Sequence, residues 1–343
     1  MTGGTRVADF VRPYAEPHAV RVVSGGLARG ELTLEVETGD GRLIVRAIAG
    51  DEPAHPSRVG CAVPGNAQWV ATRAQTLRTL EAMGYEAPRL VRTRAGEFVS
   101  RRGNWRCYGA TWVPGTAVGP DDRQLVLAGE ALGRLHALPF DPRRYPETGR
   151  SHWHPAAAVP AVARWLAQTA PLIPDAWREL HDAGQECVQQ VRTRLPDLRE
   201  TLTHGDAWPG NWIQTAAGRI ALIDWEAGGT GPAMFDLGRA LLECHLDADV
   251  AGGWLITPDA GRIRAFLTGY RRHFVPSPSE LDALRASTMF GVALMAAVHF
   301  RQVLLDGAHG PHLDGRMTRL LNRAQAVGPV ADLATAAIGE LSG

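Results

Sequence analysis

Apolar and polar residues alternate along three short segments in the first fifty residues. Leu32, Leu34 and Val36 occupy every second position of one segment, and similar apolar runs fill residues 20–23 and 43–46. A period of two is typical of β-strands, and the Gly39-Asp40-Gly41 stretch suits a turn between two of them. We therefore expect three strands between residues 20 and 48, preceded by a short helix over residues 5–17.

Beyond residue 65 the apolar positions mostly recur every three or four residues, which is typical of helices. Two short apolar segments, 89–92 and 98–101, interrupt this pattern, and we expect them to form a hairpin that turns at Ala95-Gly96, before a last strand near Cys107. The helices that we expect cover residues 66–83, 121–138, two segments within 158–195, 236–242, 259–274, 279–305, 313–326 and 330–341. The pattern predicts an α+β protein with an early sheet and a later, mainly helical part.

The sequence from His204 to Asn211, HGDAWPGN, has the form H-x-D-x-x-x-x-N. Asp224 follows behind the apolar run 220–223, so we expect a loop between short strands and an acid at the end of the next strand. Kinases use this layout, with one Asp accepting the substrate hydroxyl and the Asn and second Asp holding magnesium on ATP. The alternative is an ordinary turn, because Asp, Asn, Gly and Pro are common in loops.

The stretches HGDAWPGNW and LIDWE resemble the aminoglycoside phosphotransferase and choline kinase-like family, over about residues 20–321. The resemblance implies a two-lobed protein-kinase-like fold with a small antiparallel-sheet N-lobe and a larger helical C-lobe. The implied parts are a nucleotide-binding lobe at 1–109, a hinge at 110–115 and a catalytic and substrate-binding lobe at 116–343. The family's substrates vary widely, so the resemblance implies a reaction more firmly than a substrate.

In this scheme Asp206 orients the acceptor hydroxyl, His204 braces the loop, and Asn211 and Asp224 hold Mg²⁺. Glu226 lies two residues past Asp224, on the same face if the strand continues, and either assists the metal or holds the loop. Asp236 steadies the catalytic core by resemblance; otherwise it is an acid favoured at a helix N-terminus. His136 is expected to be a packed structural histidine.

The resemblance also places the nucleotide in the N-lobe. The backbone of Gly25 and Gly26, in a glycine-rich turn, would approach the phosphates, as would the side chain of Arg46; the alternatives are a plain hairpin and a solvent-facing arginine on an edge strand. The hinge residues proposed for adenine are Ala110, Thr111, Trp112 and Val113. The donor can be ATP or GTP.

The chain departs from the kinase pattern at two points. All 36 residues counted as lysine plus arginine are arginine, so any side-chain cation on the phosphates is a guanidinium, which binds phosphate through a planar fork. Residues 53–80 also contain no Asp or Glu, although kinases pair a helix acid in this region with the strand cation. These departures keep a second hypothesis open, a nucleotide- or ligand-binding pseudokinase of the same fold; a third is a related transferase with another activated donor.

The acceptor is less defined than the reaction. Cationic aminoglycosides favour acid-rich pockets, and the candidate acids are Glu226, Glu243 and Asp247. Trp208 could stack on a sugar ring or a flat drug, or could equally belong to the core. Arginines interleave with the acids, so the expected electrostatic field is mixed. We expect a hydroxylated antibiotic, sugar-like molecule or other natural product as the acceptor, with resistance, biosynthesis and salvage all open as roles.

Composition limits the remaining function classes. The formal net charge is zero, which gives no argument for binding nucleic acid or a membrane surface. The beginning of the chain lacks the apolar run of a secretory signal, and we found no apolar run near the length of a membrane span. Four cysteines without C-x-x-C spacing suggest free thiols. We therefore expect a cytoplasmic enzyme of undetermined oligomeric state.

Overall fold

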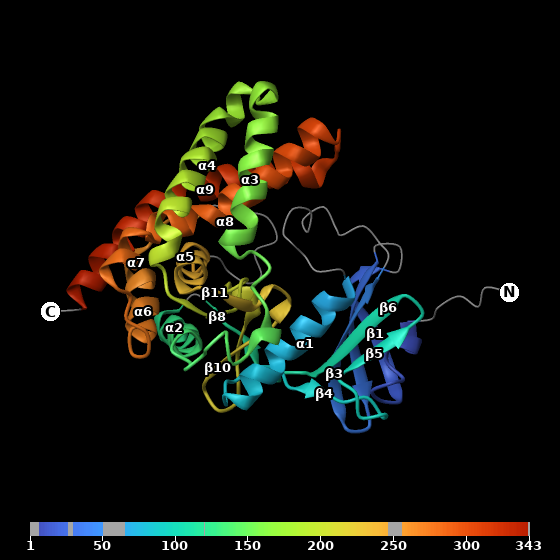
Figure 1. The fold of residues 1–343 in the computed structure, drawn as a ribbon. Coiled ribbons are helices and arrows are strands. Elements are labelled where there is room, and N and C mark those ends of the chain that lie inside the picture. The colour runs from blue at the N-terminus through green and yellow to red at the C-terminus, as the bar shows by residue number, and fades with distance from the viewer. Residues whose placement is uncertain (1–6, 27–29, 51–65, 120, 246–255, 342–343) are drawn as a thin grey trace. The chain divides into compact units, whose positions relative to one another are not determined.

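The computed structural model describes residues 7–26, 30–50, 66–119, 121–245 and 256–341 of the 343-residue chain (Figure 1). It contains two compact units. The described residues up to Pro114, together with Tyr145–Gly149, form the first; Gly115–Arg144 and the described residues from Arg150 onward form the second. The first is built on an antiparallel sheet and the second is mainly helical, which confirms the predicted α+β fold class.

The sheet of the first unit starts with three antiparallel strands in chain order, as the alternating pattern predicted. They are β1 (Pro17–Gly26), β2 (Glu31–Thr38) and β3 (Gly41–Ala49). On its other side β3 pairs with β6 (Trp105–Thr111), so β3 is an interior strand. Arg46 therefore does not lie on an edge strand.

The predicted hairpin between residues 89–92 and 98–101 is wrong in its pairing. The chain turns there, with the Thr93 amide donating to the Glu97 carbonyl over 2.6 Å. However, β4 (Leu90–Val91) and β5 (Val99–Arg102) both pair with β6 instead of with each other. They are short, and the longer β6 offers each of them a continuous row of backbone partners.

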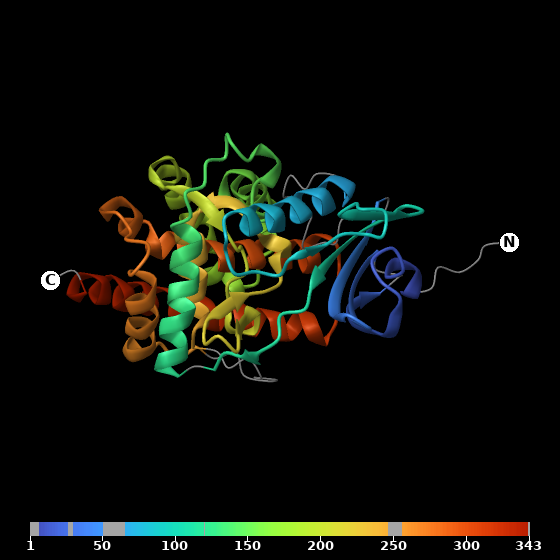
Figure 2. The same cartoon turned by 90° about the horizontal axis from the view of Figure 1, so that it is seen from below.

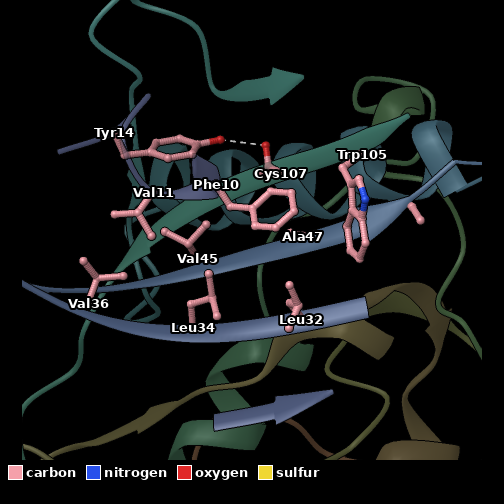
Figure 3. Close-up of a cluster of buried hydrophobic side chains, with 11 residues drawn as sticks. Phe10, Val11, Tyr14, Leu32, Leu34, Val36, Val45, Ala47, Trp105 and Cys107 are labelled. Atoms are coloured by element: carbon pink, nitrogen blue, oxygen red, sulfur yellow. Dashed lines mark hydrogen bonds between the residues drawn. The ribbon is translucent and has the colours of Figure 1, made fainter. Parts of the chain in front are cut away.

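One face of this sheet packs against the N-terminal segment (Figure 3). Alternate residues Leu32, Leu34 and Val36 of β2 lie on one face, as predicted, and belong to the same buried cluster as Phe10. The Tyr14 hydroxyl closes the layer by donating to the Cys107 carbonyl over 2.6 Å. Within the predicted helix at 5–17, the described residues from Val7 onward form only a 3₁₀ turn, Val7–Phe10, because Pro13 lacks the amide that a longer helix needs.

The helix α1 (Asn66–Ala82) covers the opposite face of the sheet (Figures 1 and 2). Trp69, Val70, Leu77 and Leu80 form its buried stripe, as the sequence pattern predicted. A second contact ties α1 to the 3₁₀ turn Pro146–Thr148, where the Thr79 and Thr148 hydroxyls lie 3.0 Å apart.

The second unit contains most of the helices. Those before the candidate site are α2 (Asp122–His136), α3 (Pro155–Thr169) and α4 (Asp175–Arg194). Those after it are α5 (Ala233–Glu243), α6 (Ala260–Tyr270), α7 (Pro278–Asp282), α8 (Leu284–Phe300) and α9 (Pro311–Glu340). α8 is the central apolar helix and packs against α3, α4, α5 and α9.

Two predictions about the last helices are wrong. The expected helices 313–326 and 330–341 are one continuous helix, α9, with Pro329 inside it. Proline is unfavourable inside a helix, but packing of α9 along α6 and α8 outweighs that preference. The expected helix 279–305 is divided into α7 and α8, and a π-helical turn follows at Arg301–Leu305.

One described segment, Leu284–Leu305, is long and apolar enough to cross a membrane by length and composition, which the sequence analysis did not recognise. About 61% of its most apolar window is buried within the protein. A helix in the core of a globular unit shows burial of this kind, so length and composition are weak evidence that this segment spans a membrane.

Three of the four cysteines lie in the described residues, and all three are buried free thiols. Burial raises the pKa of Cys107, Cys187 and Cys244 to about 12. They are therefore protonated and unreactive at neutral pH; Cys61 lies outside the described residues.

The helices α2 and α6 approach each other closely enough for backbone contact (Figure 2). A Cβ atom built on Gly129 of α2 would lie 1.9 Å from the Phe266 carbonyl oxygen, and one built on Gly269 of α6 would lie 1.9 Å from the Val126 oxygen. Only glycine fits at these positions.

We therefore expect Gly129→Ala to destabilise the second unit by about 1–3 kcal/mol or more, because overpacking must push α2 and α6 apart. Gly291→Ala is the matched control, since Gly291 is also helical but has no atom within 4 Å of its added Cβ. That control should change stability by no more than about 1 kcal/mol, in the stabilising direction. Thermal and urea unfolding measure both variants, and equal stability of the two would contradict the packing argument.

Candidate active site

Four short strands of the second unit frame the kinase-like motif. β8 (Glu200–Thr203) leads into the loop 204–211 and pairs with β11 (Gly229–Pro232). β9 (Trp212–Gln214) follows the loop and pairs with β10 (Ile220–Leu222) through a turn at Gly218, whose φ is +73°. The loop between short strands and the acid after the next strand thus lie where the sequence predicted.

The carboxylate of Asp236, on the first turns of α5, holds the beginning of the loop. It accepts hydrogen bonds from the amides of His204 (2.5 Å) and Gly205 (2.7 Å). Gly205 has φ +74°, and a Cβ there would lie 2.5 Å from the Ala227 oxygen, so the sharp turn requires glycine.

Asp236 is buried, and burial alone would raise its pKa. Its hydrogen bond and charge interaction with His136 and its contacts with His204 outweigh burial and lower the pKa below the ordinary 3.8. The Nε2 of His136 lies 3.3 Å from the Asp236 carboxylate, and its Nδ1 lies 2.8 Å from the Tyr270 hydroxyl of α6. His136 is therefore a packed structural residue, as expected, and it connects the α2–α6 contact to the loop.

The side chain of His204 joins the two halves of the motif. It is fully buried and its ring lies edge-on to Trp225, with centroids 4.6 Å apart. Nδ1 accepts from the Asp206 amide at 3.3 Å, and Nε2 donates to the Ile223 carbonyl at 2.8 Å. This geometry suits a residue that braces the loop against the strand leading to Asp224.

Asn211 makes the second connection across the motif. Its side-chain amide donates to the main-chain oxygen and to Oδ2 of Asp206, both at 2.9 Å. Its own carbonyl accepts from the Ile223 amide at 3.0 Å. The side-chain Oδ1 of Asn211 is thereby turned away from Asp206 and keeps its lone pairs for another partner.

Asp224 is the one described non-glycine residue with a positive φ, at +63°. Such a conformation is uncommon for a residue with a side chain and is concentrated at functional sites. The strand ends at Leu222 and a 3₁₀ turn, Trp225–Ala227, begins at once. The strand does not continue to Glu226, so the condition under which Glu226 would share a face with Asp224 is not met.

The donor set fits a hard divalent cation. Among the described residues no group of three or more His, Cys, Asp and Glu side chains could hold a metal ion alone. Mg²⁺ binds instead through one or two protein oxygens together with phosphates and waters. The Asn211 amide oxygen and the Asp224 carboxylate, joined through Ile223, supply oxygens of this kind.

The structure adds a residue that the sequence analysis missed. Arg239 Nη2 lies 2.5 Å from Oδ1 of Asp206, so the Asp206 carboxylate is held by Arg239 on one oxygen and by Asn211 on the other. Arg239 lies one helical turn after Asp236 on α5, which places both on the face towards the loop. This spacing was the signal in the sequence that could have revealed it.

The structure also gives the surroundings of two other residues that were predicted to contact the acceptor, Glu243 and Trp208. Glu243 is only 7% exposed, and its Oε1 lies 3.2 Å from Arg323 and 3.7 Å from Arg239, so its charge is already balanced. Trp208 is half-buried, with its indole beside Gly210. Asp247 lies outside the described residues.

The predicted nucleotide contacts belong to the first unit. Gly25, with φ +83°, and Gly26 end β1 opposite the first residues of β2. Arg46 is half-buried on β3 between Thr33 and Tyr108. In the predicted hinge the Thr111 and Trp112 amides donate to the Arg89 and Arg42 carbonyls, at 2.8 and 3.1 Å.

The sheet-bearing first unit and the helical second unit define a kinase-like fold. A family model described as the phosphotransferase enzyme family, APH, matches residues 20–274. The chain belongs to this family and is a phosphotransferase.

Solved structures share this fold at low sequence identity. An amicoumacin kinase, hAmiN, in complex with AMP-PNP, Ca²⁺ and Ami superimposes with a TM-score of 0.64 at 15% identity, covering 93% of this chain and 90% of that one. A microcompartment-associated aminopropanol kinase gives 0.63 at 16% identity, covering 92% and 94%. Spectinomycin phosphotransferase APH(9)-Ia, with ADP and spectinomycin, gives 0.58 at 13% identity and covers 94% of both chains.

We expect Asp236→Asn to lower stability by about 1–3 kcal/mol at neutral pH, because one loop amide would face an NH₂ group instead of an acceptor oxygen. Since the folded state lowers the Asp236 pKa, this carboxylate stabilises the protein above its ordinary pKa of 3.8 and loses that contribution as pH falls. The difference between wild type and variant should therefore shrink on acidification. Urea unfolding between neutral and acidic pH tests this; a constant difference would contradict it, and Asp332→Asn on the exposed side of α9 is the control.

Proposed function

We propose that this phosphotransferase moves the γ-phosphoryl group of ATP to a hydroxyl of a small-molecule acceptor. The observation that carries the proposal is the Asp206 carboxylate. It is partly exposed, at 30%, and is fixed between Asn211 and Arg239; the Asn211 main chain in turn bonds Ile223, which follows the end of β10 and precedes Asp224. A carboxylate so held can accept a hydroxyl hydrogen on a lone pair that its two partners leave open.

Phosphoryl transfer needs positioning and charge neutralisation more than covalent help from the protein. Asp206 orients the acceptor oxygen towards the phosphorus and takes its proton as the new P–O bond forms and the bond to ADP breaks. A carboxylate is a weak base for a free alcohol, so its main contribution is orientation. Arg239 and Asn211 keep this carboxylate in one position.

We propose Asn211 and Asp224 as the residues that hold Mg²⁺. The ion would neutralise the charge on the β- and γ-phosphates during transfer. His204 serves this pair indirectly, since it fixes the Ile223 carbonyl and the Asp206 amide at the same time. The oxygen donors and the left-handed backbone of Asp224 support the assignment.

For the nucleotide we propose the first unit, residues 1–109, with 110–115 as the hinge. Gly25, Gly26 and Arg46 would contact the phosphates. The interior position of Arg46 on β3 supports this role. Because the Thr111 and Trp112 amides are already used by the sheet, adenine would meet the Val113 amide and the carbonyls from Ala110 onward. ATP is the proposed donor, and GTP would use the same contacts.

We propose a hydroxylated antibiotic, sugar-like molecule or other natural product as the acceptor, with modification in the cytoplasm as the setting. The similar solved kinases are named for amicoumacin, spectinomycin and aminopropanol. Resistance is one role that this chemistry supports.

Asp206→Asn should lower phosphoryl transfer by about 10²–10⁴-fold, because the variant keeps the shape but loses the proton acceptor. ATP affinity should stay unchanged, since Asp206 belongs to the acceptor side. Acceptor mass, ADP release and nucleotide binding are measured together over a panel of hydroxylated compounds. Wild-type nucleotide binding without modification of any acceptor would favour the pseudokinase hypothesis, and full turnover by the variant would reject Asp206.

Asp224→Asn tests the metal assignment. Asparagine tolerates the left-handed conformation at this position, so the fold should persist while the charge is lost. We expect Mg²⁺ to strengthen nucleotide binding about tenfold less in the variant than in wild type. Titration of AMP-PNP with Mg²⁺ and with EDTA measures this, and an unchanged response to Mg²⁺ would reject Asp224 as a metal ligand.

A further inference from the structure

A cavity of about 450 Å³ lies within the second unit, apart from the residues proposed for phosphoryl transfer. It lies where α2 ends, where β8 begins and beside the turn that follows α6. The lining residues that bear on its chemistry are His136, Ala137, Arg199, Glu200, Phe274 and Val275. None of them belongs to the loop 204–211 or to the segment around Asp224, so the proposed reaction does not account for this cavity.

The Arg199 side chain forms a wall of the cavity with its charge already balanced. It donates to both carboxylate oxygens of Glu280, at 2.9 and 2.6 Å, and Glu280 is fully buried. It also donates to the Val275 carbonyl at 2.7 Å, and its guanidinium carbon lies 4.1 Å from the centroid of the Phe274 ring. With Val275 57% exposed, this side of the cavity presents an apolar surface next to a neutralised arginine.

Glu200 carries a negative charge that is not balanced in this way. Its Oε1 accepts from Nε2 of His154 at 2.9 Å, and Nδ1 of the same ring accepts from the Ala156 amide at 3.1 Å. A ring that donates at one nitrogen and accepts at the other is neutral, and burial lowers the pKa of His154 despite the opposing effect of Glu200. Among the described residues no arginine forms an ion pair with Glu200. Its side chain is 41% exposed, so its second oxygen is open to a ligand.

The end of α2 adds negative potential to the same cavity. α2 ends at His136 and its C-cap is Ala137, and Pro139 has no amide with which to cover them. The carbonyl oxygens of His136 and Ala137 receive no hydrogen bond from the described residues. Carbonyl groups left open at a helix C-terminus carry a partial negative charge, which favours cations. Glu200 and α2 therefore act in the same direction.

We propose that this cavity is a second ligand site, which binds a small organic cation. The ammonium group would lie between the Glu200 carboxylate and the end of α2, with the apolar body of the ligand against Phe274 and Val275. An ammonium group donates up to three hydrogen bonds and accepts none, which matches a carboxylate oxygen and open carbonyls. Binding at this site involves neither ATP nor Asp206, so it does not rest on the proposed transfer.

An occupant of the cavity would lie beside the support of the loop 204–211. The buried ring of His136 lines the cavity and lies 3.3 Å from the carboxylate of Asp236, which accepts from the amides of His204 and Gly205. A cation that orders the end of α2 would therefore slow hydrogen exchange at these two amides.

Three small ligands with one ring and different charges test the site: benzylamine, benzamide and benzoate. None has a hydroxyl group, so none can act as a phosphoryl acceptor. His273 also lines the cavity, and the titrations are therefore run at pH 8, where an ordinary imidazole is neutral, and at constant ionic strength. We expect ligand-detected NMR to show benzylamine binding at least about tenfold more tightly than benzamide, and benzoate binding most weakly.

Substitutions connect the binding to this cavity. Glu200→Gln should remove the preference for benzylamine, and Glu200→Asp should keep part of it. Glu340→Gln is the matched control, because Glu340 is an exposed acid that pairs with Arg264 outside the cavity. Ala137→Leu should block benzylamine, since Ala137 has a right-handed helical backbone that accepts leucine and its new side chain would fill the cavity.

Equal affinity for the three ligands, tighter binding of benzoate, or no binding up to millimolar concentrations would overturn the inference. An unchanged preference in Glu200→Gln, or benzylamine binding that survives Ala137→Leu, would place the cation elsewhere and overturn it too. Hydrogen exchange of the segment 200–211 is compared with and without benzylamine in wild type and in Glu200→Gln. Slower exchange in wild type alone supports the connection to the loop, and equal exchange with bound benzylamine would reject that connection.

Discussion

The buried carboxylate of Asp236 is the interaction on which the candidate site depends. A buried charge is costly unless donors surround it. Asp236 meets this requirement with the amides of His204 and Gly205 and with the ring of His136. These donors come from the loop and from α2, so one carboxylate on α5 connects three segments that are distant in the sequence. The position of Asp206, two residues past His204, follows from this.

The support behind Asp236 is itself built on backbone contact. Gly129 and Gly269 let α2 and α6 approach until carbonyl oxygens of one helix fill the space where side chains would be on the other. This contact fixes the end of α2, where His136 also meets Tyr270 of α6. Packing between α2 and α6 therefore orients the His136 ring, which supports Asp236 and through it the loop 204–211.

The parts of the fold and site that the sequence predicted are those in which neighbouring residues carry the information. The alternation of Leu32, Leu34 and Val36 defines a strand and its buried face without reference to distant residues. The H-x-D-x-x-x-x-N spacing likewise specifies a loop, and the apolar run before Asp224 specifies the next strand. These features agree with the structure because local backbone preferences and tertiary packing favour the same conformation.

The predictions failed where contacts between residues far apart in the sequence determine the structure. Residues 89–101 have the pattern of a hairpin, but β6 is a better partner for both strands. Pro329 suggests a helix end, yet packing against α6 and α8 carries α9 through it. The ion pair between Arg239 and Asp206 joins residues on different elements, so the only local hint of it is the one-turn spacing between Asp236 and Arg239 on α5.

The permanently charged basic side chains of this protein are all of one chemical type, which affects how the protein can be labelled and modified. Every basic side chain that can carry a permanent charge, including those around Asp206, is a guanidinium, and the 343 residues contain no side-chain primary amine. Reagents that acylate amines leave these charges intact, as do acetylation and ubiquitin conjugation at lysine. Immobilisation or labelling through amine chemistry would thus spare the whole site, and control of the protein's lifetime within these residues must act on other groups.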